Sequence, residues 1–151
     1  MVGLEINDSE GATGIQKMKQ RRFDHIDLRV KDRHRAQEFY EKILPALGFT
    51  REKSDEEWGT FYAETNGVPT EFFGFTEDKS HRPNETRIAF WADTRDEVNQ
   101  IAEVVRKAGG QNLEGPQLWP EYTAGYYALF FEDTDGNKLE VCCRQSALVA
   151  Q

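Results

Sequence analysis

The stretch "DTDGNKLEVC", residues 133 to 142, decides the fold because it joins a tight turn to a strand. Residues 133–137 carry the aspartate, glycine and asparagine that favour such a turn. Leu139, Val141 and Cys143 then alternate in the way that the buried face of a strand does. Glu140 must therefore stand on the opposite face, which meets water, an ion-pair partner or a metal.

The composition is that of a soluble globular domain. The chain has 151 residues, of which 38% are hydrophobic and 30% charged. No apolar run reaches the roughly 20 residues of a membrane span, and the first residues lack the pattern of a signal peptide. Cys142 and Cys143 are adjacent and point to opposite faces of a strand, so we expect no disulfide and a cytoplasmic setting.

The charge balance excludes two classes of partner. The chain carries 27 acidic and 19 basic residues, a formal net charge of −8. Nucleic acids and anionic membranes are held mainly by basic patches. We therefore expect a small-molecule ligand or substrate, with no nucleic acid and no membrane.

Two segments of the chain read alike. "FDHIDLRVKDR" (23–33) and "ETRIAFWADTR" (85–95) each predict a strand followed by a helix start, at a constant shift of 62. Asp32 is placed to cap the first helix, and Thr94 with Glu97 forms a capping box for the second. Amphipathic helices in matching phase follow, and glycines end them.

A second match extends the repeat. "TNGVPTEFF" (65–73) maps onto "TDGNKLEVC" (134–142) at a shift of 69, which makes Glu71 the counterpart of Glu140. Another register of this strand would put Gly74 there instead, and the sequence leaves the choice open. The further strands are expected at 47–54, 58–64, 70–76, 111–114, 125–132 and 137–143.

The repeat predicts an α+β fold of two βαβββ modules in tandem, with a cupped mixed sheet and helices outside. Module one covers about 22–80 and module two about 84–146, after an N-terminal arm (1–21) and before a short tail (147–151). Strand alternation places His25 and Arg87 on the face away from the helices, in a shared cleft. Because such sheets expose edges that a partner can cover, we expect a homodimer.

The sequence resembles the vicinal oxygen chelate superfamily of glyoxalases, bleomycin- and fosfomycin-resistance proteins and extradiol dioxygenases. The resemblance is carried by "DHIDLRVKDRHRAQEFYEKILPALGF", "TRIAFWADTRDEV" and "GYYALFFEDTDGNKLEV". It implies a small molecule bound in the cupped-sheet cleft and, in metal-using members, a lyase, isomerase or dioxygenase reaction. Such a fold does not by itself specify the reaction.

The resemblance also implies a set of metal ligands. His25 and Glu140 match ligand positions, and Glu71 would be the third ligand, with Glu71 or Glu140 as general base. Arg87 stands where a second histidine is usual, and a guanidinium cannot donate a lone pair to a metal. One histidine with two carboxylates would suit Mn²⁺, Fe²⁺ or Ni²⁺ as well as Zn²⁺.

The alternative is a metal-free binder that sequesters its ligand. Arg87 would then pair with Glu140 or anchor an anionic, planar ligand. The aromatic loop around 119–127 could close over such a ligand, or its rings could simply pack the loop down. Cys142 is either a site residue or a small buried hydrophobe. The expected ligand-contacting residues are Arg87, Trp91, Phe73, Trp119, Tyr122, Tyr126 and Cys142.

Overall fold

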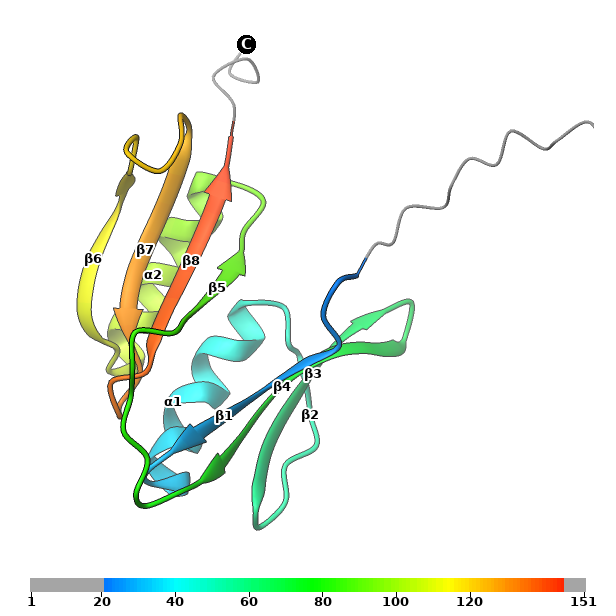
Figure 1. The fold of residues 1–151 in the computed structure, drawn as a ribbon. Helices are drawn as coiled ribbons and strands as arrows, with labels where there is room; N and C mark the ends of the chain where they lie inside the picture. Colours follow the sequence, from blue (N-terminus) through cyan, green and yellow to red (C-terminus); the bar gives the residue numbers. More distant parts are fainter. Residues whose placement is uncertain (1–20, 146–151) are drawn as a thin grey trace, which may run out of the picture.

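The computed structural model describes residues 21–145 and has two βαβββ modules, each a four-stranded mixed sheet with one helix (Figure 1). The predicted α+β tandem fold is confirmed. The expected arm falls on the undescribed residues except for Arg21, and the tail lies outside the described residues.

The first module contains β1 (His25–Val30), α1 (Arg33–Ala46), β2 (Arg51–Glu52), β3 (Trp58–Thr65) and β4 (Val68–Glu77). The second contains β5 (Arg87–Trp91), α2 (Arg95–Ala108), β6 (Gln111–Leu118), β7 (Tyr126–Glu132) and β8 (Lys138–Arg144).

The two sheets have the same strand order. The first runs β1-β4-β3-β2 and the second β5-β8-β7-β6, with one parallel pair in each, β1 with β4 and β5 with β8. β1 and β5 are therefore edge strands of separate sheets. Within residues 21–145, neither helix is long and apolar enough to cross a membrane.

Both helices begin at the predicted caps. The Asp32 side chain accepts a hydrogen bond from the Arg35 backbone N–H, and Thr94 accepts one from Glu97. The Glu97 carboxylate reaches back to the Asp93 backbone N–H at 2.6 Å. The helix α2 ends at Gly109, whose φ of 92° is left-handed and suits a residue without a Cβ.

The core lies between the helices and the inner faces of both sheets. The two helices pack on each other, and Phe90 of the second module contacts Phe49 and Phe73 of the first. These rings lie 6.1 and 5.6 Å from Phe90 between centroids. The modules consequently share one hydrophobic core.

The turn at 133–137 fastens the second module to the first. Asp133 is 1% exposed, and its carboxylate accepts hydrogen bonds from the backbone N–H groups of Asp135 and Asn137. The Tyr40 hydroxyl of α1 donates to the same carboxylate at 2.7 Å. The Asn137 amide also donates to the Arg29 carbonyl of β1 at 3.1 Å. A stretch that the sequence marks as a local turn is thus a contact between modules.

The register of β4 settles the open choice in favour of Gly74. Gly74 pairs with Asp27 on β1, as Glu140 pairs with Ala89 on β5, so the repeat shift for the last strand is 66 and not 69. The difference of three is odd, and an odd slip moves every side chain to the other face. The assignment of Glu71 as the counterpart of Glu140 was therefore wrong.

The same slip corrects the position of Phe73. This ring was expected on the cleft face, but it is 1% exposed in the core and contacts Tyr40 at 5.3 Å. Phe72 occupies the cleft face instead, in register with His25. Two strand bounds also differ, since the strand expected at 47–54 is reduced to β2 and the one expected at 111–114 extends through Leu118.

Candidate functional site

A groove of about 530 Å³ lies between the two modules and is the candidate site. Its lining includes Phe73 and Phe90, which belong to the hydrophobic core. Two large rings at the groove are exposed to solvent, Phe23 at 80% and Trp91 at 57%. The polar side chains that line it are Arg21, Arg22, Asp24, His25 and Glu71. Concave, mostly apolar sites of this size with a few polar groups are typical of small-molecule binding.

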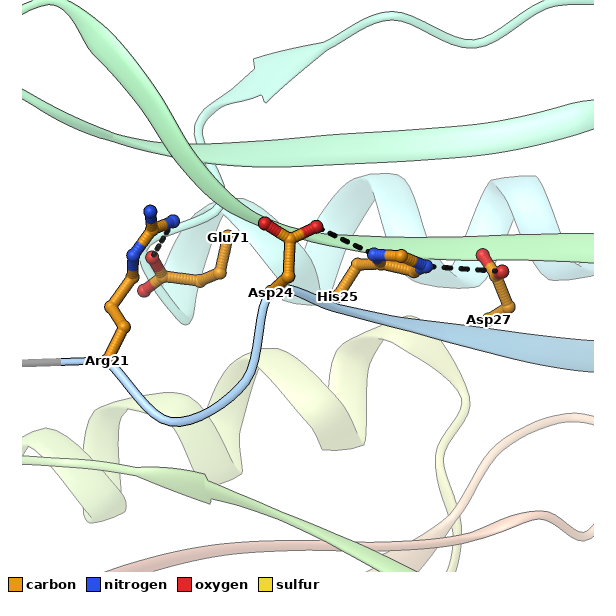
Figure 2. Close-up of polar contacts among 5 residues, drawn as sticks. All are labelled: Arg21, Asp24, His25, Asp27 and Glu71. Carbon is orange, nitrogen blue, oxygen red and sulfur yellow. Dashed lines mark hydrogen bonds and ion pairs between the residues drawn. The ribbon is translucent and has the colours of Figure 1, made fainter.

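His25 is held on the groove wall from three sides. Figure 2 shows its ring between the carboxylates of Asp24 and Asp27. The Nδ1 atom lies 2.7 Å from Asp24 Oδ2, whereas Nε2 lies 3.6 Å from Asp27 Oδ2. The ring stacks on Phe72 with 4.4 Å between centroids and an interplanar angle of 7°. The side chain remains 42% exposed, so a ligand can reach it.

Glu71 lies at the groove with its carboxylate turned toward Arg21 (Figure 2). Its carboxylate is 4.0 Å from the Arg21 guanidinium, and both side chains are about half exposed. An exposed pair at that distance holds its partners only weakly. Glu71 also shares the strand parity of Phe73, so it does not stand beside the His25 ring in the sheet.

Asp27 takes over the space that a side chain from β4 would fill. Gly74, the counterpart of Glu140, has no side chain, and the position of an added Cβ would lie 3.0 Å from Asp27 Oδ1. The carboxylate nearest the Nε2 face of His25 is therefore supplied by β1 itself. Strand alternation already places Asp27 on the cleft face, so the sequence carried this signal.

Glu140 is buried on the outer face of the second sheet, at 5% exposure. The Tyr126 hydroxyl donates a hydrogen bond to its carboxylate. Burial, together with Cys142 and Glu140, raises the pKa of Tyr126, so this hydroxyl stays protonated and remains a donor. Burial also raises the pKa of the Cys142 thiol. The Tyr126 hydroxyl and the Cys142 thiol beside Glu140 are thus neutral hydrogen-bond donors.

Arg87 does not pair with Glu140. Its guanidinium lies over the Phe130 ring, 4.5 Å from the centroid, and the residue is exposed. Among residues 21–145, no carboxylate lies within ion-pair distance of it. The ion pair that the sequence offered for Glu140 is replaced by the hydrogen bond from Tyr126.

The aromatic loop packs on the second sheet. Trp119 lies edge-on to Phe130 at 5.0 Å, and its Nε1 donates to the Ala128 carbonyl at 3.1 Å. Tyr122 contacts Tyr126 at 5.6 Å, yet it remains 61% exposed. The rings therefore hold the loop down over the face that carries Glu140, while Tyr122 still presents a surface to a ligand.

The predicted metal ligands are not brought together within one chain. His25 and Glu71 belong to the first module, and Glu140 is buried in the second under Tyr126. Across the part of the chain that the structure describes, no three His, Cys, Asp or Glu side chains are grouped as metal ligands. These donors do not fit a divalent metal in a single chain, and their role as ligands stays a prediction.

Sequence reasoning missed four residues of the site. Asp24 and Phe72 hold His25, Asp27 faces its Nε2, and Arg21 contacts Glu71. Asp24 and Arg21 precede the first strand, so strand alternation could not place them. The ring of His81 also has a partner, since its Nε2 lies 2.7 Å from Asn137 Oδ1.

The fold, the strand order and the final turn agree with one protein family. The family model described as the Glyoxalase/Bleomycin resistance protein/Dioxygenase superfamily matches residues 22–141. The chain belongs to this superfamily. Superfamily members bind small molecules, which agrees with a groove of this size between the modules.

Individual relatives are distant. Virulence protein STM3117 of Salmonella typhimurium is 26% identical over 122 residues, which cover 80% of this chain and 82% of that protein. A glyoxalase/bleomycin resistance protein of Albidiferax ferrireducens T118 superposes with a TM-score of 0.65 at 21% identity, covering 82% of this chain and 98% of that one.

A second solved structure holds ligands. It is a mutant of the fosfomycin resistance protein FosX of Listeria monocytogenes, complexed with Mn(II) and 1S,2S-dihydroxypropylphosphonic acid. The TM-score is 0.57 at 21% identity, and the match covers 82% of this chain and 90% of that one. At such identities these structures establish a shared fold and leave the reaction open.

Proposed function

We propose that this member of the superfamily binds a small planar molecule in the groove between its modules, without a metal in the single chain. The observation that carries the proposal is the groove itself, with an apolar lining of core side chains and two exposed rings, Phe23 and Trp91. Exposed aromatic rings beside an apolar groove are suited to stacking on a flat ligand.

The polar groups support binding that is directional. His25 is oriented by Asp24 and Phe72, so its ring cannot turn freely when a ligand arrives. A side chain held in advance loses less entropy on binding. The groove therefore combines a nonspecific apolar surface with one fixed polar contact.

A second candidate site is favoured by Arg87. Its exposed guanidinium rests on Phe130 and has no carboxylate within ion-pair distance among residues 21–145. Such a cation on the Phe130 ring, which the exposed Tyr122 ring also contacts at 6.1 Å, would suit an anionic group on a ligand. This is the sequestration-type function with Arg87 as anion anchor.

A metal-dependent lyase, isomerase or dioxygenase is the competing proposal. Its support is the Mn(II) complex of FosX, a protein with the same fold. In this chain it would need His25, Glu71 and Glu140 to converge, for example across a homodimer. We favour the metal-free proposal because each of these three side chains is engaged elsewhere.

The test is a fragment screen by NMR on the full chain, using planar bicyclic compounds. Trp91→Ala should weaken binding at the groove by about fivefold or more, on the scale of a lost aromatic contact. Tyr122→Ala removes a similarly exposed ring on the second sheet and serves as the matched control. Equal effects of the two variants, or no binding at all, would count against the groove.

A further inference from the structure

A second arginine stands on the same face of the second sheet as Arg87. Arg87 is aligned with Lys138 at the start of β8, and Arg144 ends that strand. Because side chains alternate along a strand, residues 138 and 144 point to one side of the sheet, and Arg87 points to that side with them. Both arginines are exposed. The face that carries Glu140 therefore has a guanidinium from each end of β8.

Each guanidinium rests on an aromatic ring and lacks an acidic partner. Arg87 lies 4.5 Å from the centroid of Phe130, and Arg144 lies 4.6 Å from the centroid of Tyr126. Among residues 21–145, no carboxylate lies within 4.0 Å of either guanidinium. In a chain with a net charge of −8, two such cations on one face indicate a surface for an anionic ligand.

Two acidic side chains of this face are engaged by other groups. Glu140 is 5% exposed, and its carboxylate accepts the hydrogen bond from Tyr126. The Glu132 carboxylate accepts a hydrogen bond from the Asn112 amide at 2.8 Å. Neither carboxylate therefore occupies the position that a ligand would take against the guanidiniums.

A continuous set of rings connects the two arginines. The Tyr122 ring contacts both rings that carry a guanidinium, Phe130 at 6.1 Å and Tyr126 at 5.6 Å between centroids. Tyr122 is also 61% exposed, so its free surface lies between the two cations. A flat ligand can stack on this ring while its two ends reach the two guanidiniums.

Resting on the sequestration-type function with Arg87 as anchor, we infer that the second sheet binds a flat dicarboxylate, with one carboxylate on Arg87 and the other on Arg144. A guanidinium presents parallel N–H donors that match a carboxylate. Its contact with a ring orients it in advance, which lowers the entropy lost on binding. Arg144 is then the residue that selects for a second carboxylate.

The experiment compares naphthalene-2,6-dicarboxylate with 2-naphthoate on the full chain by NMR titration at low salt. The two probes share one ring system and differ by a carboxylate. The dicarboxylate should bind about fivefold more tightly, the upper range for one exposed ion pair. In Arg87→Ala and in Arg144→Ala this preference should fall to about twofold or less, because one guanidinium remains for either carboxylate.

Arg29→Ala is the matched control, since that exposed guanidinium lies 5.5 Å from the Trp58 ring on the first sheet. It removes the same charge and should leave the preference unchanged. Absence of the preference in the native chain, absence of binding, or an equal loss in Arg29→Ala and Arg144→Ala overturns the inference.

The two arginine variants distinguish this inference from the function on which it rests. If Arg87→Ala weakens 2-naphthoate while Arg144→Ala leaves the preference intact, Arg87 remains an anchor and the inference alone is wrong. If neither variant affects either probe, the sequestration-type function with Arg87 as anchor is wrong as well. Binding at the groove is tested separately by Trp91→Ala.

Discussion

The Tyr40 hydroxyl donates a 2.7 Å hydrogen bond to the buried carboxylate of Asp133, and this contact joins the helix of the first module to the final turn of the second. Burial, reinforced by the Asp133 charge, raises the pKa of Tyr40 well above its ordinary value, so the hydroxyl remains a donor throughout the physiological range. The groove lies between the same two modules, and its width depends on how they are held.

Removal of this hydroxyl should loosen the module contact. Tyr40→Phe leaves the buried Asp133 carboxylate one donor short, and we expect a loss of about 1–3 kcal/mol in the free energy of unfolding. Urea denaturation measures it. Tyr127→Phe is the matched control, since that hydroxyl donates to Asn99 near the surface and should cost less than about 1 kcal/mol. Equal losses in the two variants would mean that the Tyr40–Asp133 hydrogen bond stabilises the fold no more than the exposed one does.

Gly59 should tolerate no side chain. A Cβ there would lie 2.1 Å from the Phe75 ring, which is completely buried. Gly59→Ala should cost about 2 kcal/mol or more because the core cannot make room. In Gly74→Ala the nearest atom is Asp27 Oδ1 at 3.0 Å, and that side chain can turn away. The second variant should therefore be the more stable one in the same denaturation assay.

The acid stability of the β2–β3 connection should depend on Asp55. Its carboxylate accepts hydrogen bonds from the backbone N–H groups of Trp58 and Glu57, which lowers its pKa below the ordinary value in the folded chain. A lowered folded pKa means that ionised Asp55 stabilises the fold above its unfolded pKa and that this contribution is lost as the pH falls through the folded pKa.

Asp55→Asn isolates that contribution. The difference in unfolding free energy between the native chain and the variant should be largest near neutral pH and shrink as the pH falls below about 4. Urea titrations at a series of pH values give the difference directly. A difference that stayed constant with pH would show that the carboxylate's charge is not involved.

Both cysteines should be unreactive in the folded protein. Cys142 and Cys143 are free and buried, and burial raises the pKa of each thiol. Because the thiolate is the reactive form, alkylation by iodoacetamide should be more than about tenfold slower than after unfolding. Mass spectrometry distinguishes one adduct from two. Fast single labelling of the native chain would contradict the burial of Cys142 beneath the aromatic loop.

Whether the chain binds a divalent metal ion can be measured directly. Elemental analysis of the protein, as isolated and after incubation with Mn²⁺, Fe²⁺, Ni²⁺ or Zn²⁺, should find less than stoichiometric metal, because the candidate ligands are not grouped in one chain. His25→Ala should leave that content unchanged. Stoichiometric metal that is lost in this variant would instead establish the metal-dependent proposal, and light scattering would then show whether a dimer assembles the site.

The sequence alone determined the repeat, the helix caps and the face on which each residue of β1, β5 and β8 stands. Those features depend on local propensity and on alternation, which are properties of neighbouring residues. Thus His25 and Glu140 were placed on the faces away from the helices, and the structure agrees.

Tertiary structure decided the pairings between distant elements. The register of β4 follows from its hydrogen bonds to β1, and an odd slip exchanges Phe73 for Phe72 on the cleft face. The partner of Glu140 is Tyr126 and not Arg87, because β7 lies against β8 and brings the hydroxyl within reach. Alternation specifies a face but not a neighbour, and only packing brings neighbours from separate strands together.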